Sequence, residues 1–183
     1  MPSHLIGPRT DRLFHRAMTP GDADAFFALN SDPEVMRFTG EPPLCSLGQA
    51  REAIEAYPDF RVHGFGRWGC FLRVPDAVTG SSAGAMIGFC GLKRLAEFDA
   101  VDVGFRFLPQ YWGRGYATEA ARASVAFGFG TLGLDRIIAL VLPENGASIR
   151  VIEKLGMRRV GRSGCQGLDA LRYEVLRVDA QGI

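Results

Sequence analysis

The chain has 183 residues, 47% of them hydrophobic and 22% charged, with a formal net charge of +1. This composition is typical of a globular protein. The near balance of charge gives no strong field that favours nucleic acid or an anionic membrane, so neither is an expected partner, although a local basic patch is still compatible with the net charge. The length predicts a single domain over residues 1–183, with a core at about residues 10–177.

Cysteine and histidine usage gives no pattern for a metal centre. The three histidines are too few for a recognisable ligand set, and the four cysteines are widely spaced without a C-x-x-C pair: Cys45, Cys70, Cys90 and Cys165. We therefore expect no metal, and reduced thiols as in a cytosolic protein. No long apolar run or cleavable signal pattern is visible, so the expected location is cytoplasmic.

The first third of the chain predicts one strand and two helices. Residues 10–19 alternate in polarity, which predicts a strand. Thr19 is a candidate N-cap for a helix over residues 21–30, because a proline and an acidic residue follow it. Ser46 is a candidate cap for a second helix over residues 47–57.

From residue 67 onward the pattern is mainly that of a sheet. Amphipathic runs predict two helices, over residues 117–129 and 146–155. The predicted strands are residues 67–74, 85–94, 101–107, 137–142, 157–161 and 168–178. This order of elements favours an α+β or mixed α/β sandwich over a doubly wound sheet.

Two short motifs match catalytic signatures in the wrong context. Residues 80–84 read G-x-S-x-G, the hydrolase nucleophile elbow, but a strand follows where a helix is needed, and all histidines precede Ser82. Residues 128–133 read G-x-G-x-x-G, but they follow a helix and precede a strand, the reverse of a dinucleotide site. A solvated turn and a helix end explain them better.

The stretch LPQYWGRGYATE, residues 108–119, joins a predicted strand to a predicted helix. Gly113 and Gly115 allow positive φ and remove Cβ atoms that would keep a ligand from the backbone. The following helix directs free N–H groups and its positive dipole end at this turn, a geometry that holds a phosphate or pyrophosphate. The alternative is a tight turn whose glycines serve connectivity alone.

The order Gln110-x-x-Gly113-x-Gly115-x-Ala117 resembles the acetyl-CoA loop of the GNAT superfamily of N-acetyltransferases. The longer stretch VDVGFRFLPQYWGRGYATEA is most similar to the branch that acetylates protein N-termini, notably those of ribosomal proteins. A later Asn-x-x-Ser stretch matches in order. The resemblance implies a GNAT-like fold, with a central, mostly antiparallel sheet of about seven strands flanked by about four helices.

The resemblance also implies acetyl-CoA as cofactor, CoA as product, and no metal. Backbone N–H groups of the loop would hold the pyrophosphate, and Arg114 would add a charged contact or remain solvated. The edge of the strand at residues 103–107 would pair with the pantetheine arm. The implied cofactor-binding residues are Phe105, Phe107, Gln110, Gly113, Arg114, Gly115, Tyr116, Ala117, Asn145 and Ser148.

In the resembled family this strand is splayed at a bulge, where a backbone N–H stabilises the thioester oxygen. Gly104 is the corresponding candidate for a bulge, and Phe105 or Phe107 would supply the donor. The alternative is that Gly104 only relieves packing.

A second implied constellation begins at Asn145, which would contact pantetheine or substrate amides, with Ser148 near the departing sulfur. The alternative for Asn145 is a helix N-cap. Many family members place a tyrosine acid where this chain has Ile152, which leaves Ser148 or solvent to protonate the thiolate. Tyr173 is expected to be a half-buried aromatic of a closing strand.

Asp102 stands where the resembled branch usually has Glu, which implies a general base acting through water; a surface ion pair is the alternative. The implied catalytic residues are Asp102, Ser148 and Asn145. The expected acceptor is a protein N-terminal α-amino group, whose pKa of about 7.7–8.0 leaves part of it neutral at pH 7. A small amine (a polyamine, an aminoglycoside or an amino acid) and a catalytically silent CoA-binding module remain alternatives.

The acceptor pocket is expected around residues 39–47 and 60–67, which carry no motif. Phe60, Phe65 and Trp68 are candidates for its lining, with core packing as the alternative. The sequence leaves the oligomeric state open, a homodimer included.

Overall fold

The computed structural model describes residues 5–73, 84–165 and 167–179. Within these residues, eight strands form one sheet in the order β1-β2-β3-β4-β5-β6-β8-β7. Neighbouring strands are antiparallel except β5 and β6, which run parallel and pair at one register position. The predicted class, a mostly antiparallel sheet in a mixed α/β fold, is confirmed, and the described residues form one strand and two α-helices more than expected.

The strands are β1 (Ile6–Arg9), β2 (Leu13–Arg16), β3 (Arg67–Leu72), β4 (Met86–Leu95), β5 (Ala100–Phe107), β6 (Arg136–Val141), β7 (Arg158–Cys165) and β8 (Leu168–Leu176). The helices are α1 (Ala23–Ser31), α2 (Pro33–Met36), α3 (Leu47–Glu55), α4 (Asp59–His63), α5 (Tyr116–Gly130) and α6 (Gly146–Lys154). Short 3-10 turns are η2 (Pro20–Asp22), η3 (Ala96–Phe98), η4 (Pro109–Tyr111) and η5 (Arg177–Asp179).

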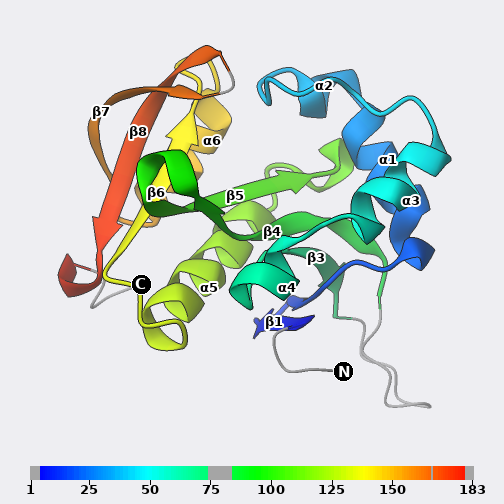
Figure 1. The fold of residues 1–183 in the computed structure, drawn as a ribbon, viewed down its shortest axis with the longest axis horizontal. Helices are drawn as coiled ribbons and strands as arrows, with labels where there is room; N and C mark the ends of the chain where they lie inside the picture. Colours follow the sequence, from blue (N-terminus) through cyan, green and yellow to red (C-terminus); the bar gives the residue numbers. More distant parts are fainter. Residues whose placement is uncertain (1–4, 74–83, 166, 180–183) are drawn as a thin grey trace.

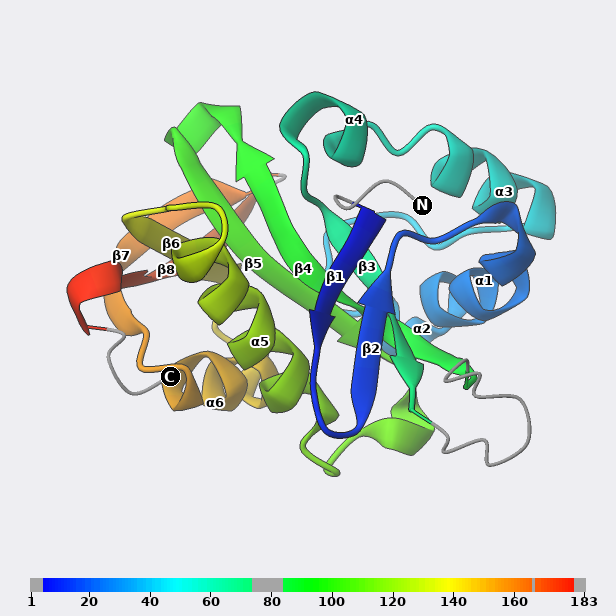
Figure 2. The same cartoon turned by 90° about the horizontal axis from the view of Figure 1, so that it is seen from below.

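Helices cover the two faces of the central strands differently (Figures 1 and 2). Side chains alternate along a strand, so one set of β3 and β4 residues faces α5. Trp68 packs edge-on against Phe127 of α5, with ring centroids 5.3 Å apart, and Cys90 Sγ lies 3.5 Å from Ser124 Oγ. This is the apolar core face. The opposite face, which carries Phe89, looks toward α1, α2, α3 and α4.

Helix starts follow the predicted capping residues. Thr19 caps the turn η2, which leads directly into α1, and Asp22 completes a capping box. Ser46 Oγ accepts from the Gln49 N–H at 3.2 Å at the start of α3. These contacts explain why helices begin where the polar caps occur, although α3 ends at Glu55, before the expected limit.

The strands differ from prediction most at β1 and β7, and β2 (Leu13–Arg16) is shorter than the predicted 10–19. β1 (Ile6–Arg9) was missed because Gly and Pro, which disfavour strands, occupy its centre. β7 continues to Cys165 instead of ending at Gly161, since a register shift against β8 between Arg159 and Gly161 absorbs the irregular glycine.

Several other expectations can be placed on the structure. In the described ranges, no helix has the length and apolarity to cross a bilayer, and no group of three or more His, Cys, Asp or Glu side chains could hold a metal ion. Cys45, Cys70 and Cys90 are free thiols. Residues 80–83 of the G-x-S-x-G motif lie outside the described residues.

Candidate active site

The loop between β5 and α5 has the backbone conformation that its glycines predict. Gly113 and Gly115 have φ of +72° and +82°, a region that residues with a Cβ rarely adopt. A Cβ built on Gly113 would meet no atom within 4 Å, and one on Gly115 would meet only Arg12 Nη2, at 3.4 Å. The space beside both glycines is therefore open, and a side chain would fill it.

Free backbone donors line this loop. Gly115 is the N-cap of α5, a 15-residue helix whose positive dipole end points into the loop, and Tyr116 and Ala117 form its first turn. The N–H groups of residues 113–118 donate no hydrogen bond within the described part of the chain. Such donors call for an acceptor from solvent or a ligand. The loop therefore fits a pyrophosphate held by main-chain N–H groups.

Side chains from the turn between β1 and β2 fix the start of α5. The Glu119 carboxylate accepts from Thr10 Oγ1 at 2.5 Å and from Arg12 Nε at 2.6 Å. Arg12 Nη1 also donates to the Arg114 carbonyl oxygen at 2.9 Å. Burial alone would raise the pKa of Glu119, but these hydrogen bonds lower it. The side chains of Arg114 and Gln110 are exposed beside this anchored turn.

The parallel strands β5 and β6 separate directly after the pairing of Asp102 with Ile138. Farther along β6, the Leu140 N–H donates to Asp102 Oδ1 at 3.2 Å. This amide is therefore paired with a side chain of β5 and not with its main chain. The remaining halves of the two strands then diverge (Figure 1). This divergence leaves one edge of β5 without a neighbouring strand.

The open edge of β5 carries main-chain donors. The Leu108 N–H donates to the Ile87 oxygen at 3.0 Å, so the even-numbered residues of β5 turn their amides toward β4. Phe105 and Phe107 therefore turn theirs toward the open edge. Trp112 Nε1 donates to the Phe107 carbonyl at 2.6 Å, which confirms that direction. Such an edge suits an arm with amide groups, or a developing oxyanion.

The Asp102 side chain is buried at this separation, with the residue 5% exposed. Its Oδ2 accepts a hydrogen bond from Arg67 Nη2 at 2.7 Å, and its Oδ1 accepts one from the Leu140 N–H. Burial raises the pKa of Asp102, and the charge of Arg67 and the Leu140 N–H oppose the rise. The alternative of an ion pair is therefore correct in kind, but the pair with Arg67 is buried and not at the surface. A carboxylate with a raised pKa is a better proton acceptor near neutral pH.

Gly104 does not form the expected β-bulge. The β4–β5 register runs from Gly88 opposite Phe107 to Leu95 opposite Ala100 without a shift. Gly104 instead lies under the Arg67 guanidinium, since a Cβ there would come within 2.4 Å of Arg67 Nη2. The alternative, a glycine required by packing, is correct.

Asn145 and Ser148 lie together at the N-terminus of α6, where Asn145 Oδ1 accepts from the Ser148 N–H at 3.1 Å. Asn145 is thus a helix N-cap, and its amide Nδ2 has no partner within the described residues. Because β5 and β6 are parallel and precede α5 and α6, the N-termini of both helices lie at the end of the sheet where the strands diverge.

Ile152 and Tyr173 belong to the core. Ile152 is 2% exposed, so nothing titratable stands where many GNAT proteins place a tyrosine. Tyr173 is 5% exposed and pairs between Ala139 and Arg159, so it is more buried than expected.

A cavity of about 800 Å³ lies between the helices α1–α4 and the face of the sheet opposite α5. Most of its lining is apolar, with aromatic and aliphatic side chains from the helices, their loops and β4: Met18, Phe26, Leu44, Ile54, Phe60 and Phe89. It reaches Arg67, whose guanidinium contacts Asp102 and Gly104. The cavity therefore adjoins the point where β5 and β6 separate.

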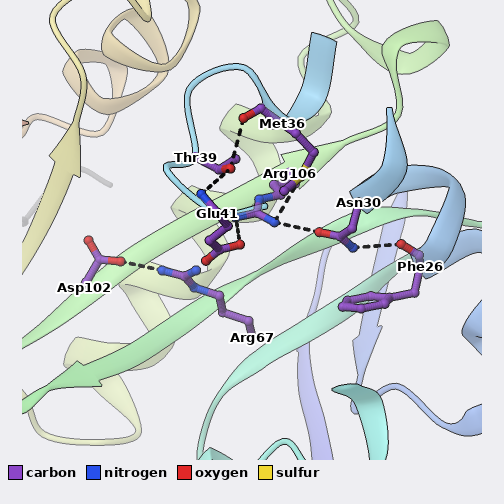
Figure 3. A network of polar contacts seen from close by, with 8 residues as sticks. All are labelled: Phe26, Asn30, Met36, Thr39, Glu41, Arg67, Asp102 and Arg106. Carbon is purple, nitrogen blue, oxygen red and sulfur yellow. Dashed lines mark hydrogen bonds and ion pairs between the residues drawn. The ribbon is translucent and has the colours of Figure 1, made fainter. Parts of the chain in front are cut away.

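A row of charged side chains crosses the floor of this cavity (Figure 3). Arg67 pairs with Asp102 at one end. At the other end, Arg106 pairs with Glu41 at 2.5 Å and donates to Asn30 Oδ1 at 2.6 Å. The row lies on one face because opposite residues of antiparallel strands share a face.

Sequence reasoning located the cavity only in part. Both expected segments contribute to the lining, through Glu41 and Leu44 in one and Phe60 and Arg61 in the other. Trp68 does not contribute, because it faces α5. The sequence carries a partial signal for the charged floor, because Asp102 and Arg106 lie four residues apart in one predicted strand and so on the same face. Lys93 joins them only through the register of the two strands.

Comparisons with known proteins agree with this geometry. The model of the acetyltransferase (GNAT) domain family matches residues 12–158. The uncharacterized N-acetyltransferase YnaD of Bacillus subtilis (strain 168) is 50% identical over 159 residues, 83% of this chain and 82% of that protein. The uncharacterized N-acetyltransferase YoaA of the same strain is 35% identical over 153 residues, with 83% and 82% covered.

A solved structure of a GNAT-family acetyltransferase from Bacillus anthracis has a TM-score of 0.75 at 28% identity, covering 93% of this chain and 98% of that one. The family model covers most of the chain, and its match includes the glycine loop, β5, β6 and α6. The chain therefore belongs to the GNAT family and is an acetyl-CoA-dependent N-acyltransferase.

Proposed function

We propose that this acetyltransferase acts on an α-amino group, with the N-terminus of a protein as the acceptor. The observation that carries the proposal is the alignment of the open glycine loop, the unpaired edge of β5 and the cavity beside Asp102. An α-amino group has a pKa of about 7.7–8.0, so part of it is already the neutral nucleophile at pH 7. A lysine amine, near 10.4, would need a stronger base.

In the proposed reaction the amine nitrogen bonds to the acetyl carbonyl carbon, and the carbon–sulfur bond breaks. The proton lost from nitrogen balances the thiolate that leaves as CoA. Main-chain N–H groups of Gly113, Gly115, Tyr116 and Ala117 hold the pyrophosphate, with Gln110 and Arg114 at the rim. The N–H groups of Phe105 and Phe107 bind the arm and the carbonyl oxygen.

In this proposal Asp102 accepts the amine proton through a water, because both of its carboxylate oxygens already hold protein donors. Asn145 Nδ2 binds an amide of the arm or of the acceptor, and Ser148 lies beside the departing sulfur. Since a free thiol has a pKa of about 8.5, departure of the thiolate requires little assistance.

A polyamine acceptor is disfavoured by the cavity. A polycation would need carboxylates in the lining, but one acidic residue, Glu41, lines the cavity beside four basic ones, and Glu41 pairs with Arg106. The charge of the cavity therefore favours an acceptor that carries no cation besides its reacting amine.

Two glycines with matched backbones test the cofactor site. Gly113 and Gly133 have φ of +72° and +69°, and a Cβ on either would meet no atom closer than 3.7 Å. Both Gly113→Ala and Gly133→Ala should lose about 1 kcal/mol of unfolding free energy. Only Gly113→Ala should weaken acetyl-CoA binding, by at least about ten-fold in titration calorimetry. Equal affinities in the two variants, or no binding by the wild type, would reject the proposal.

A further inference from the structure

The charges that line the acceptor cavity do not balance. Its acidic residue Glu41 pairs with Arg106, and Asp102 at its end pairs with Arg67. Of the other two basic residues of the lining, Arg61 is exposed, whereas Lys93 is half-buried and lies opposite Asp102. Lys93 therefore shares the single carboxylate of Asp102 with Arg67, and two cations around one carboxylate favour a ligand that supplies a second anion.

A second observation points to the same ligand chemistry. Arg67 Nε is buried and has no hydrogen-bond partner in the described structure. Its neighbour Nη2 donates to Asp102, so the guanidinium is fixed over Gly104 with the buried Nε–H unused. A buried donor normally has an acceptor, and a carboxylate oxygen is the acceptor that best matches a guanidinium.

Lys93 and Arg67 lie close together on the same face of two neighbouring strands, β4 and β3. Lys93 lies opposite Asp102 in the β4–β5 register, and Arg67 lies opposite Gly91 on the other side of β4. The two cations therefore share one face, next to the site where the amine must react, and most of the remaining lining is apolar. Such a cavity would recognise an anionic group and an apolar group attached close to one amine.

From these contacts we infer that the acceptor is a primary amine bearing a carboxylate and an apolar side chain, with the carboxylate bound by Lys93 and Arg67. The inference rests on the proposed function, since it describes the acceptor of the same transfer. The carboxylate has two sources: the α-carboxylate of a free apolar amino acid, or an acidic side chain at the second position of a protein N-terminus.

Calorimetric titration of the full chain, with and without saturating CoA, tests the inference without turnover. One arm compares L-methionine with L-methioninamide, and the other compares a peptide beginning Met-Asp with one beginning Met-Asn. In at least one of the two arms, the probe with the carboxylate should bind at least ten-fold more tightly than its amide counterpart. Spermidine should bind more weakly than both carboxylate probes. Equal binding within both pairs, no binding of any probe, or tighter binding of spermidine would overturn the inference.

A matched pair of variants assigns the effect to the cavity. Lys93→Met removes the cation and keeps a similar apolar stem, and it should abolish the preference for the carboxylate form. Lys154→Met changes the only other lysine of the chain, which is exposed on α6, and should keep the full preference. A preference that survives Lys93→Met would refute the role of that residue. Loss of acetyl-CoA binding in the wild type would instead refute the proposed function, and the probe titrations without CoA would still decide the charge preference.

Discussion

Asp102 Oδ1 accepts a hydrogen bond from the Leu140 N–H at the point where the only parallel strand pair of the described sheet separates. The side chain thus takes up an amide that an unbroken ladder would have paired with main chain. Its other oxygen accepts a hydrogen bond from Arg67, which lies on the floor of the cavity proposed for the acceptor. One carboxylate therefore links the open edge of β5, proposed to bind the cofactor, to that cavity.

The Asp102–Arg67 pair should show strong coupling in a double-mutant cycle. Asp102→Asn keeps an oxygen for Leu140 but leaves the guanidinium unpaired, and Arg67→Met leaves the carboxylate unpaired. Each single variant should lose about 2–3 kcal/mol of unfolding free energy, measured by urea unfolding. This loss is somewhat smaller than that for breaking a fully buried ion pair, because the Arg67 side chain is 23% exposed. The double variant should recover most of the loss.

An exposed pair provides the control for this cycle. Arg162 and Asp169 are 52% and 63% exposed, so Asp169→Asn should change the unfolding free energy by less than about 0.5 kcal/mol. Additive losses in the Asp102–Arg67 cycle would show that the two charges do not depend on each other.

Local patterns in the sequence predicted much of this site. The change from alternation in β5 to the amphipathic pattern of α5, with two glycines between them, predicted the loop and its positive φ values. Asn145 and Ser46 were predictable as caps because capping depends on residues within one turn.

Long-range register could not be predicted in the same way. Arg67 and Asp102 are 35 residues apart, and Thr10 and Glu119 are 109 apart, so no local pattern brings them together. The error at Gly104 has the same origin. A glycine in a strand marks either a bulge or a close approach, and only the position of Arg67 distinguishes the two.

Acid should weaken the anchor of α5 through Glu119. The pKa of this carboxyl is lowered in the folded protein, so its stabilising effect is present above the unfolded value of 4.5 and is lost as the pH falls through the folded pKa. Glu119→Gln keeps an acceptor for Thr10 but removes the charge that Arg12 contacts. The difference in unfolding free energy between wild type and variant should be largest near neutral pH and should shrink below about pH 4.5.

Urea unfolding at a series of pH values measures this difference. Glu52→Gln, at an exposed position of α3, is the control for the loss of one surface carboxylate and should change the unfolding free energy little. Asp22, whose pKa is also lowered in the fold by its bonds to Arg16 and Thr19, keeps its own acid dependence in every variant. A Glu119→Gln difference that grows on acidification would contradict the assignment.

Two glycines of α5 should respond to alanine with opposite signs. Alanine is favoured over glycine in a helix by about 1 kcal/mol, so substitution is stabilising wherever space exists. Gly130 has that space, since a Cβ there would meet no atom within 4 Å. Gly128 does not, because its Cβ would lie 2.7 Å from Ile137 Cδ1 and 2.9 Å from Leu92 Cδ1. Ile137 and Leu92 are fully buried and cannot withdraw into solvent, so overpacking of about 1–3 kcal/mol should outweigh the helix preference.

Gly130→Ala should therefore raise the urea midpoint and Gly128→Ala should lower it, at unchanged m-value. A rise in both midpoints would mean that the contact of α5 with β4 and β6 adapts more easily than its packing indicates.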